Sequence, residues 1–153
     1  IVETEAYDQF DAASHSYRGE TSRTRVMFGS AGTSYVYFTY GMHYCVNIVA
    51  GAEGYGAAVL IRALEPIEGL DIMLRNRQGK GGLELTNGPA KVCQALGIDM
   101  QWNGHDLRRS PLSLAVRPPV SEPIIQTARI GITRAAAVPW RFYLKDNPYV
   151  SKP

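Results

Sequence analysis

The sequence predicts a single mixed α+β domain spanning residues 1–153, with a protruding β-hairpin, a sheet and flanking helices. A chain of 153 residues, 45% of them hydrophobic, can bury one core and is too short for two. Several segments have strand patterns, and two have helical spacing. Residues 32–47 hold two strand-forming runs joined at Gly41, which takes a positive φ readily and so favours a tight turn.

The first segment, residues 1–7, alternates in the manner of a half-buried strand. Glu3, Glu5 and Tyr7 share one face of it. Asp11 can open a short helix, which soon runs into the most basic window of the chain, containing Arg18, Arg23 and Arg25. Because the chain opens without Met and directly in a strand pattern, we expect a segment before residue 1.

The turn of the predicted hairpin carries Tyr40, Met42 and His43. An exposed turn is usually built from Asn, Asp, Gly or Ser. Large apolar groups that point outward indicate something for them to enter. The return strand is expected from about Tyr44 to Ala50, followed by a Gly-rich turn.

Residues 57–64 form an apolar run that is typical of a central strand, interrupted only by Arg62. A buried arginine needs a carboxylate or a bound anion as its partner, and Glu5 is the obvious candidate. Pro66 then suits the first turn of a helix that ends before Gly79.

A second helix is predicted after Asn87 and Pro89, with Asn87 as the capping residue and Gly97 as the stop. Lys91 in its first turn makes a phosphate site, because free amides and a cation point the same way. A capped surface helix with a solvated lysine is the alternative.

The remaining chain has weaker signals. Residues 99–123 are polar and Pro-rich, with a possible strand at 112–116. Residues 128–132 and 140–144 look like closing strands or extended segments.

Composition excludes several classes of protein. Cys45 and Cys93, the only cysteines, form no CxxC pair, which favours a reducing compartment and free thiols. The three histidines lie in no ligand pattern, so we expect neither a metal nor another cofactor. No apolar run reaches 18 residues and no signal peptide opens the chain, so we expect neither a membrane protein nor a secreted one. The formal charge of +2 argues only weakly for a polyanionic partner.

Glu5, His15, Arg62 and several tyrosines together suit an acid/base site with aromatic walls. Each has an ordinary alternative. Glu5 can be a solvated residue of an edge strand, and His15 a structural hydrogen-bonding residue. Tyr7 and Tyr37 can pack in the core instead of stacking on a ligand.

Five motifs in register resemble the alkyladenine (3-methyladenine) DNA glycosylase family. They are I-V-E-T-E-A-Y at 1–7, A-S-H-S at 13–16, Y-V-Y-F-T-Y-G-M-H-Y-C-V-N at 35–47, L-I-R-A-L-E-P at 60–66 and N-G-P-A-K at 87–91. The resemblance covers nearly the whole chain and lacks only the family's N-terminal segment. It implies a mainly antiparallel curved sheet, similar to the C-terminal domain of formyltransferases.

The resemblance also implies the roles of the site residues. Glu5 matches the general base that activates water, and Arg62 and the main chain at Ile130 help to hold that water. Residues implied to bind the flipped purine are Tyr7, Tyr37, His15 and Asn47, of which Asn47 would crowd the 2-amino group of guanine. Residues implied to contact DNA are Tyr40 as a wedge, Met42, His43 and Lys91.

The expected partner is duplex DNA containing damaged purines, bound by a monomer in the cytoplasm, the bacterial nucleoid or the nucleus. Two departures from the family pattern leave DNA contacts open: Thr24 stands where Asn is expected, and the connection at 79–82 is short. A non-catalytic lesion-binding protein and a small-molecule enzyme on the same fold are the alternatives.

Overall fold

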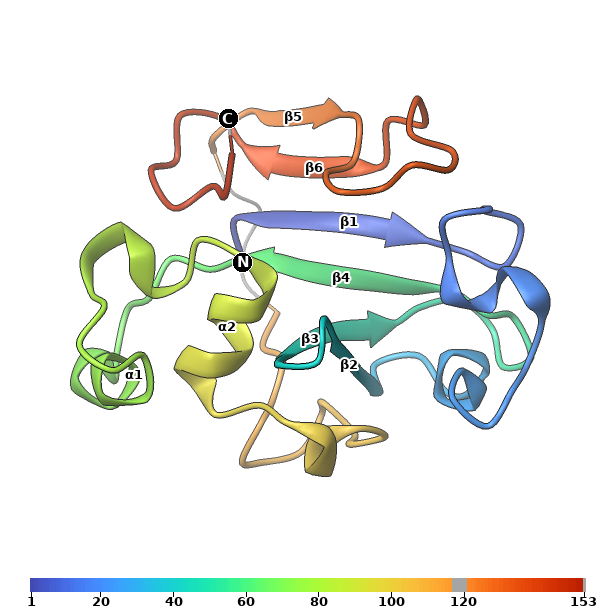
Figure 1. The fold of residues 1–153 in the computed structure, drawn as a ribbon, viewed down its shortest axis with the longest axis horizontal. Helices are drawn as coiled ribbons and strands as arrows, with labels where there is room; N and C mark the ends of the chain where they lie inside the picture. Colours follow the sequence, from blue (N-terminus) through green and yellow to red (C-terminus); the bar gives the residue numbers. More distant parts are fainter. Residues whose placement is uncertain (117–120, 153) are drawn as a thin grey trace.

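The structure, a computed structural model, describes residues 1–116 and 121–152. One antiparallel sheet of six strands runs through it in the order β2-β3-β4-β1-β6-β5 (Figure 1). The strands are β1 (Glu3–Tyr7), β2 (Ser34–Thr39), β3 (His43–Val49), β4 (Ala58–Ala63), β5 (Ile124–Thr127) and β6 (Arg141–Leu144). The predicted α+β class and antiparallel sheet are confirmed.

Two α-helices, α1 (Leu70–Asn76) and α2 (Pro89–Leu96), accompany the sheet. Helix α2 packs against β3 and β4, and α1 packs against α2 (Figure 1). Four short 3-10 helices lie in the loops: η1 (His15–Arg18), η2 (Arg25–Phe28), η3 (Gly82–Leu85) and η4 (Met100–Trp102).

Alternation along the β2–β3 hairpin separates two apolar clusters. Val36 and Val46 face α2, where they pack with Val92, Cys93 and Ile98. Tyr35 and Val49 have the opposite parity and pack with Met27 and Ala58 on the other face. Both faces of the hairpin therefore contribute to the core.

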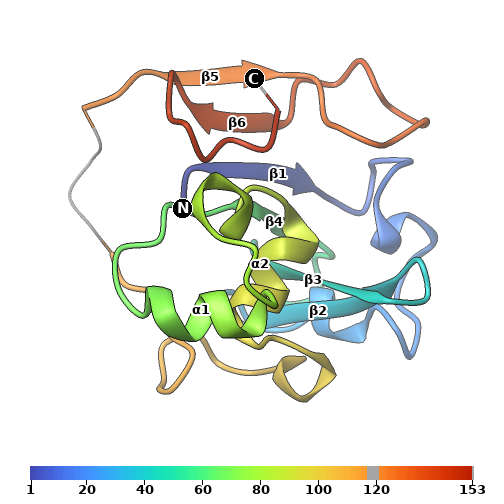
Figure 2. The same ribbon diagram turned by 60° about the vertical axis from the view of Figure 1, so that its left-hand side comes forward.

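The hairpin itself is confirmed, and Figure 2 shows its tip at the edge of the molecule. The Met42 N–H donates to the Thr39 carbonyl across the turn. Tyr40 and Gly41, the two central residues, both have positive φ, 52° and 68°. This is the backbone of a hairpin turn that follows the right-handed twist of its strands.

The first and fourth strands lie inside the sheet. Strand β4 is central, as predicted for 57–64, and β1 lies between β4 and β6. The alternative that Glu5 is a solvated residue of an edge strand is wrong, because β1 has a neighbour on each side and Glu3 and Glu5 are among the most buried side chains of the described residues. The face of β1 that carries the chemistry is thus its buried face.

Helix boundaries differ from the predicted ones in two places. The short helix starts at His15, capped by the Ser14 hydroxyl, because Asp11 is held instead in a buried ion pair with Arg129. Helix α1 starts at Leu70, four residues after Pro66. The extent of helix α2 agrees with the prediction, and Gly97 ends it with a φ of 66°.

The later part of the chain departs most from the prediction. Residues 112–116 form no strand, because Leu114 N–H donates to Leu107 and the Leu112 carbonyl accepts from His105, which ties the segment to its own loop. Residues 128–132 form no strand; β5, just before them, pairs with β6, which also pairs with β1. The predicted strand at 140–144 is confirmed as β6. Within the polar segment 99–123, residues 117–120 lie outside the described part.

Candidate active site

Glu5 lies in the middle of β1 with its side chain fully buried. The Tyr7 hydroxyl donates to Oε2 at 2.8 Å, and the Ile130 backbone N–H donates to Oε1 at 2.7 Å. The guanidinium of Arg62 lies 3.3 Å from Oε2. Both carboxylate oxygens thus have fixed donors, and the predicted trio of Glu5, Arg62 and the main chain at Ile130 is together in space.

Arg62 has two carboxylate partners, whereas the sequence suggested only Glu5. Its Nε donates to Glu3 Oε1 at 2.9 Å. Sequence reasoning missed Glu3 as a site residue. The signal was present, since Glu3 and Glu5 are two residues apart on one strand and share a face.

Tyr7 connects the buried carboxylate with an open cavity. Burial, and then the charge of Glu5 and the hydrogen bond to it, raise the pKa of Tyr7 above its usual value. The phenol therefore stays protonated and donates a hydrogen bond to Glu5. The guanidinium of Arg129 lies 4.5 Å from the centre of the Tyr7 ring, while Asp11 holds the same guanidinium in place.

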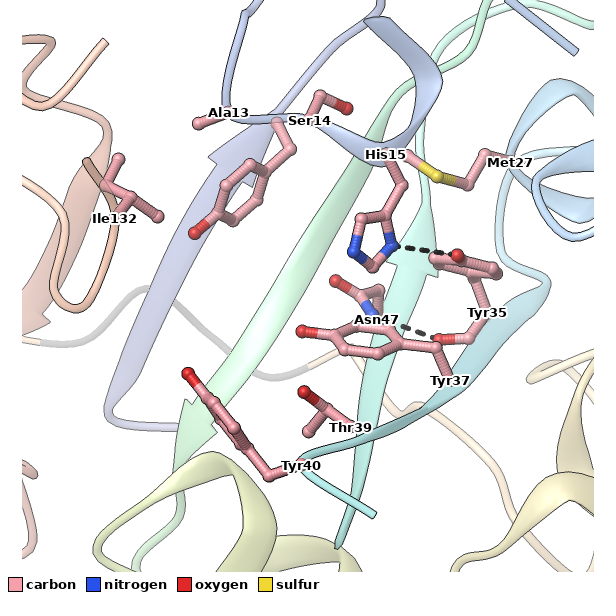
Figure 3. Close-up of a pocket in the computed structure, with 11 residues that line it drawn as sticks. Ala13, Ser14, His15, Met27, Tyr35, Tyr37, Thr39, Tyr40, Asn47 and Ile132 are labelled. Carbon is pink, nitrogen blue, oxygen red and sulfur yellow. Dashed lines mark hydrogen bonds between the residues drawn. The ribbon is translucent and has the colours of Figure 1, made fainter. Parts of the chain in front are cut away.

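Beside Tyr7 is a cavity of about 200 Å³ (Figure 3). Its walls come from β1, η1, the β2–β3 hairpin and the loop after Gly131. The lining residues are Tyr7, Ala13, Ser14, His15, Met27, Tyr35, Tyr37, Thr39, Tyr40, Asn47 and Ile132. All four residues predicted to bind the base, Tyr7, His15, Tyr37 and Asn47, therefore line one cavity.

His15 is held at the cavity by an arginine and a tyrosine. The Arg23 guanidinium can only donate, so it donates to Nε2 at 3.5 Å, and Nδ1 carries the proton that goes to Tyr35 Oη at 2.9 Å. Burial of the ring, and then the Arg23 charge, lower the pKa of His15 to about 4, although the residue as a whole is exposed. The imidazole is neutral at pH 7.

Tyr37 and Asn47 form the hairpin side of the cavity. The Tyr37 ring meets His15 edge-on, with 4.6 Å between ring centres, and burial raises its pKa above the usual value. Asn47 Nδ2 donates to the Tyr35 carbonyl at 3.1 Å, which fixes the side chain against the cavity wall (Figure 3). A fixed side chain can exclude a base by clash.

Arg23 is a second residue that sequence reasoning did not assign to the site. Besides its bond to His15, its guanidinium lies 5.8 Å from the centre of the Tyr37 ring. Its position in the most basic window was the available signal. Thr24, next to it, faces its own loop: its hydroxyl donates to the Gly19 carbonyl.

The predicted DNA-contacting residues of the hairpin lie at its tip. Tyr40 is 84% exposed and Met42 is 69% exposed, and His43 is exposed too. Tyr40 also borders the cavity. Met42 and His43 line a separate hollow of about 270 Å³ between the hairpin and α2.

Lys91 lies in the first turn of α2, outside both cavities' walls. Asn87 does not cap this helix as predicted. The N-cap is Gly88, and the Asn87 side chain accepts a hydrogen bond from Lys91 Nζ at 2.7 Å instead. Glu84 accepts a second one at 2.6 Å. The ammonium is therefore paired, although the Lys91 side chain stays 30% exposed.

The described residues contain neither a cluster that could hold a metal ion nor a helix that could span a membrane. Across 1–116 and 121–152, there is no group of three or more His, Cys, Asp or Glu side chains arranged to hold a metal ion. Within the same ranges, no helix has the length and apolar character needed to cross a membrane.

Comparison with known proteins gives one consistent result. The family model described as methylpurine-DNA glycosylase matches residues 1–148. A protein of Carboxydothermus hydrogenoformans named "Putative 3-methyladenine DNA glycosylase" is 56% identical over 154 residues, covering 99% of this chain and 81% of that protein. Proteins with the same name from Methanoculleus marisnigri and Francisella tularensis are 56% and 51% identical over 156 residues, with the same coverage. The chain therefore belongs to the methylpurine-DNA glycosylase family.

Proposed function

We propose that this protein is a monofunctional DNA glycosylase that hydrolyses the N-glycosidic bond of damaged purines in duplex DNA and leaves an abasic site. Its substrates are purines of the 3-methyladenine, hypoxanthine and ethenoadenine class. The observation that carries the proposal is the buried carboxylate of Glu5, which contacts three donors and lies next to a cavity with aromatic walls. Family membership supplies the reaction type.

In the proposed reaction Glu5 is the general base. It takes a proton from water while the water oxygen bonds to C1′ of the sugar and the bond from C1′ to the base breaks. The base leaves with the electron pair of that bond. Arg62 and the Ile130 N–H fix the carboxylate oxygens, so the geometry of attack is set before the substrate arrives.

The cavity holds the flipped base in this proposal. Tyr7 and Tyr37 stack on its two faces, at about 1–3 kcal/mol per stacked base. Stacking tolerates many purines, so discrimination falls to His15, which is neutral, and to Asn47, which is fixed beside the base. The Asn47 side chain excludes guanine by crowding its 2-amino group.

Hydrolysis at C1′ first requires that the nucleotide leave the base stack, at a cost of a few kcal/mol. Tyr40 fills the gap that it leaves, because an inserted side chain offsets the lost stacking. Met42 and His43 contact the neighbouring backbone. Lys91 binds a phosphate once the phosphate replaces Glu84 and Asn87 on its ammonium.

A water nucleophile, rather than a lysine, fits the composition of the cavity. Its lining, as far as the structure describes the chain, contains no lysine that could form a Schiff base. The product is therefore an intact abasic site without strand cleavage.

Replacing Glu5 by Gln tests the proposal, since it keeps the shape and removes the basic group. We expect single-turnover release of hypoxanthine or 3-methyladenine to fall at least about 100-fold, the scale of general base catalysis. Lesion-duplex binding in a gel-shift assay should persist. Glu68→Gln, a change at an exposed glutamate near α1, is the control and should release bases at the wild-type rate.

The alternatives give different results in the same assays. A wild-type protein that binds lesion duplex without releasing any base is a lesion-binding protein. One that shows no salt-dependent binding to duplex is a small-molecule enzyme. Near-wild-type release by the Glu5→Gln variant would show that another group is the base.

A further inference from the structure

Glu3 is a buried carboxylate that the proposed reaction does not use. It lies two residues before Glu5 on β1, and only 1% of it is exposed. Four donors surround it: Arg62 Nε at 2.9 Å, Arg141 Nε at 2.7 Å, the Ser151 N–H at 2.7 Å and the Ser151 hydroxyl at 3.0 Å. These donors come from β4, β6 and the chain after β6.

The charge of Glu3 is maintained by these contacts. Burial alone would raise its pKa, but the hydrogen bonds from Ser151 and Arg141 and the charge of Arg62 overcome burial, so the pKa of Glu3 lies below its usual value. Glu3 is therefore an ionised carboxylate at neutral pH. A buried carboxylate with four donors is a fixed point in the structure.

The guanidinium of Arg62 contacts three partners. Its Nε donates to Glu3, and its NH2 group donates to the Ser151 hydroxyl at 3.3 Å. Its NH1 group is left facing Glu5 Oε2 at 3.3 Å. The two contacts away from Glu5 determine how the planar guanidinium is turned, and therefore which nitrogen it presents to Glu5.

We infer that Glu3, supported by Ser151, is the positioning residue that orients Arg62 toward Glu5. The inference rests on the proposed function, in which Glu5 is the base and Arg62 helps to fix it. Glu3 itself does not line the cavity that holds the base. Its role is to hold the arginine in one orientation while DNA binds and the base leaves.

The geometry explains why one carboxylate would not suffice. With Glu5 as its only anionic partner, the guanidinium of Arg62 could turn to form a close two-point contact with it, which is the preferred arginine–carboxylate geometry. Such a contact would add a second donor to Oε1, which accepts from the Ile130 N–H and needs its other lone pair for the proton from water. Glu3 takes the Nε edge of the guanidinium and prevents that rotation.

The test is a double-mutant cycle between Glu3 and Arg62, measured as single-turnover rate constants of base release at saturating enzyme. Glu3→Gln keeps the shape and removes the charge. We expect it to slow base release about 10- to 100-fold, the scale of a misplaced catalytic group, with lesion-duplex binding changed less than about threefold. In an Arg62→Lys background the same change should have less than about a threefold further effect.

Three outcomes decide the inference. Non-additive effects of Glu3→Gln and Arg62→Lys support it, because a purely structural glutamate would slow release equally in the Arg62→Lys background. A wild-type rate for Glu3→Gln, or effects that multiply, overturns it. Near-wild-type release by Glu5→Gln instead shows that the proposed function has failed, independently of Glu3.

A milder variant covers the case in which Glu3→Gln does not fold. Ser151→Ala removes one hydroxyl that touches both Glu3 and Arg62. It should slow release about three- to tenfold and should also be non-additive with Arg62→Lys. A wild-type rate in this variant overturns the inference as well. Ser121→Ala, at an exposed serine before β5, is the matched control.

Discussion

His15 shows how a single residue of the cavity carries a pH-dependent property. Its pKa is about 4 in the folded protein against an ordinary value of 6.5. Between these values the unfolded chain binds the proton and the folded protein does not, so the stability contributed by the neutral ring rises with pH. It is complete above about pH 6.5 and is lost as pH falls to about 4.

Replacing His15 by Gln should therefore flatten the pH dependence of the urea midpoint between pH 4 and 6.5. Arg23→Gln should move the lower end of that window upward, because it removes a charge that depresses the pKa of His15. Urea titrations of the three proteins at several pH values measure both effects. An unchanged slope in the His15 variant would contradict the assignment.

At the residue scale, the sequence predicted which side chains gather but not all of their partners. Glu5, Arg62 and Ile130 meet as expected, and Tyr7, His15, Tyr37 and Asn47 line one cavity. Glu3 and Arg23 were missed because their importance comes from contacts across the sheet and between loops. The spacing of Glu3 and Glu5 and the basic window around Arg23 are visible in the sequence, but neither identifies the partner on another element.

Among the elements, the hairpin carries the clearest conflict between local preference and function. Tyr40 has a φ of 52°, a region that suits Gly and Asn and costs other residues about 1–2 kcal/mol. Its ring is nevertheless exposed at the tip. Strained residues often mark sites where function requires a particular side chain, here the proposed wedge.

Tyr40→Asn should accordingly raise stability and lower activity. We expect unfolding free energy to rise by up to about 1 kcal/mol, because Asn tolerates the left-handed conformation. Nucleotide flipping, followed with a fluorescent base analogue beside the lesion, should weaken more than binding to undamaged duplex. Met42→Asn is the control for stability, since Met42 is exposed on the same turn without a positive φ. A loss of stability in Tyr40→Asn, or normal flipping, would contradict the prediction.

Which elements could be predicted depended on whether their signals are local. The hairpin, β4 and α2 have such signals in turn residues, an apolar run, and Pro89 with Gly97. Residues 128–132 do not. The Arg129 side chain pairs with Asp11, and the Ile130 N–H donates to Glu5. Both partners lie more than 100 positions away in the sequence. A segment that is placed by contacts with distant charged residues shows no hydrophobic periodicity in its sequence.

For the whole molecule, the formal charge of +2 is too small to attract DNA by itself, so binding must depend on where cations lie. Arg18, Arg23 and Arg25 are exposed in one window, and Arg23 contacts His15 of the cavity. Lys91, on α2, is held by Glu84 and Asn87. An ammonium already paired with a carboxylate attracts a phosphate less than a free one does.

Glu84 should therefore restrain DNA binding through Lys91. Affinity for lesion duplex should fall with salt, at a slope of about −0.9 per phosphate contacted. Lys91→Gln should make the salt slope shallower by the amount that corresponds to about one phosphate contact. Glu84→Gln should tighten duplex binding, because the Lys91 ammonium becomes available. In a Lys91→Gln background, Glu84→Gln should lose most of that gain, which separates release of Lys91 from a general loss of negative charge.

Lys145→Gln, at an exposed lysine after β6, should leave the slope unchanged. Equal tightening by Glu84→Gln with and without Lys91 would show that the pair does not control the phosphate contact. Binding that ignores salt in every variant would remove duplex DNA as the ligand.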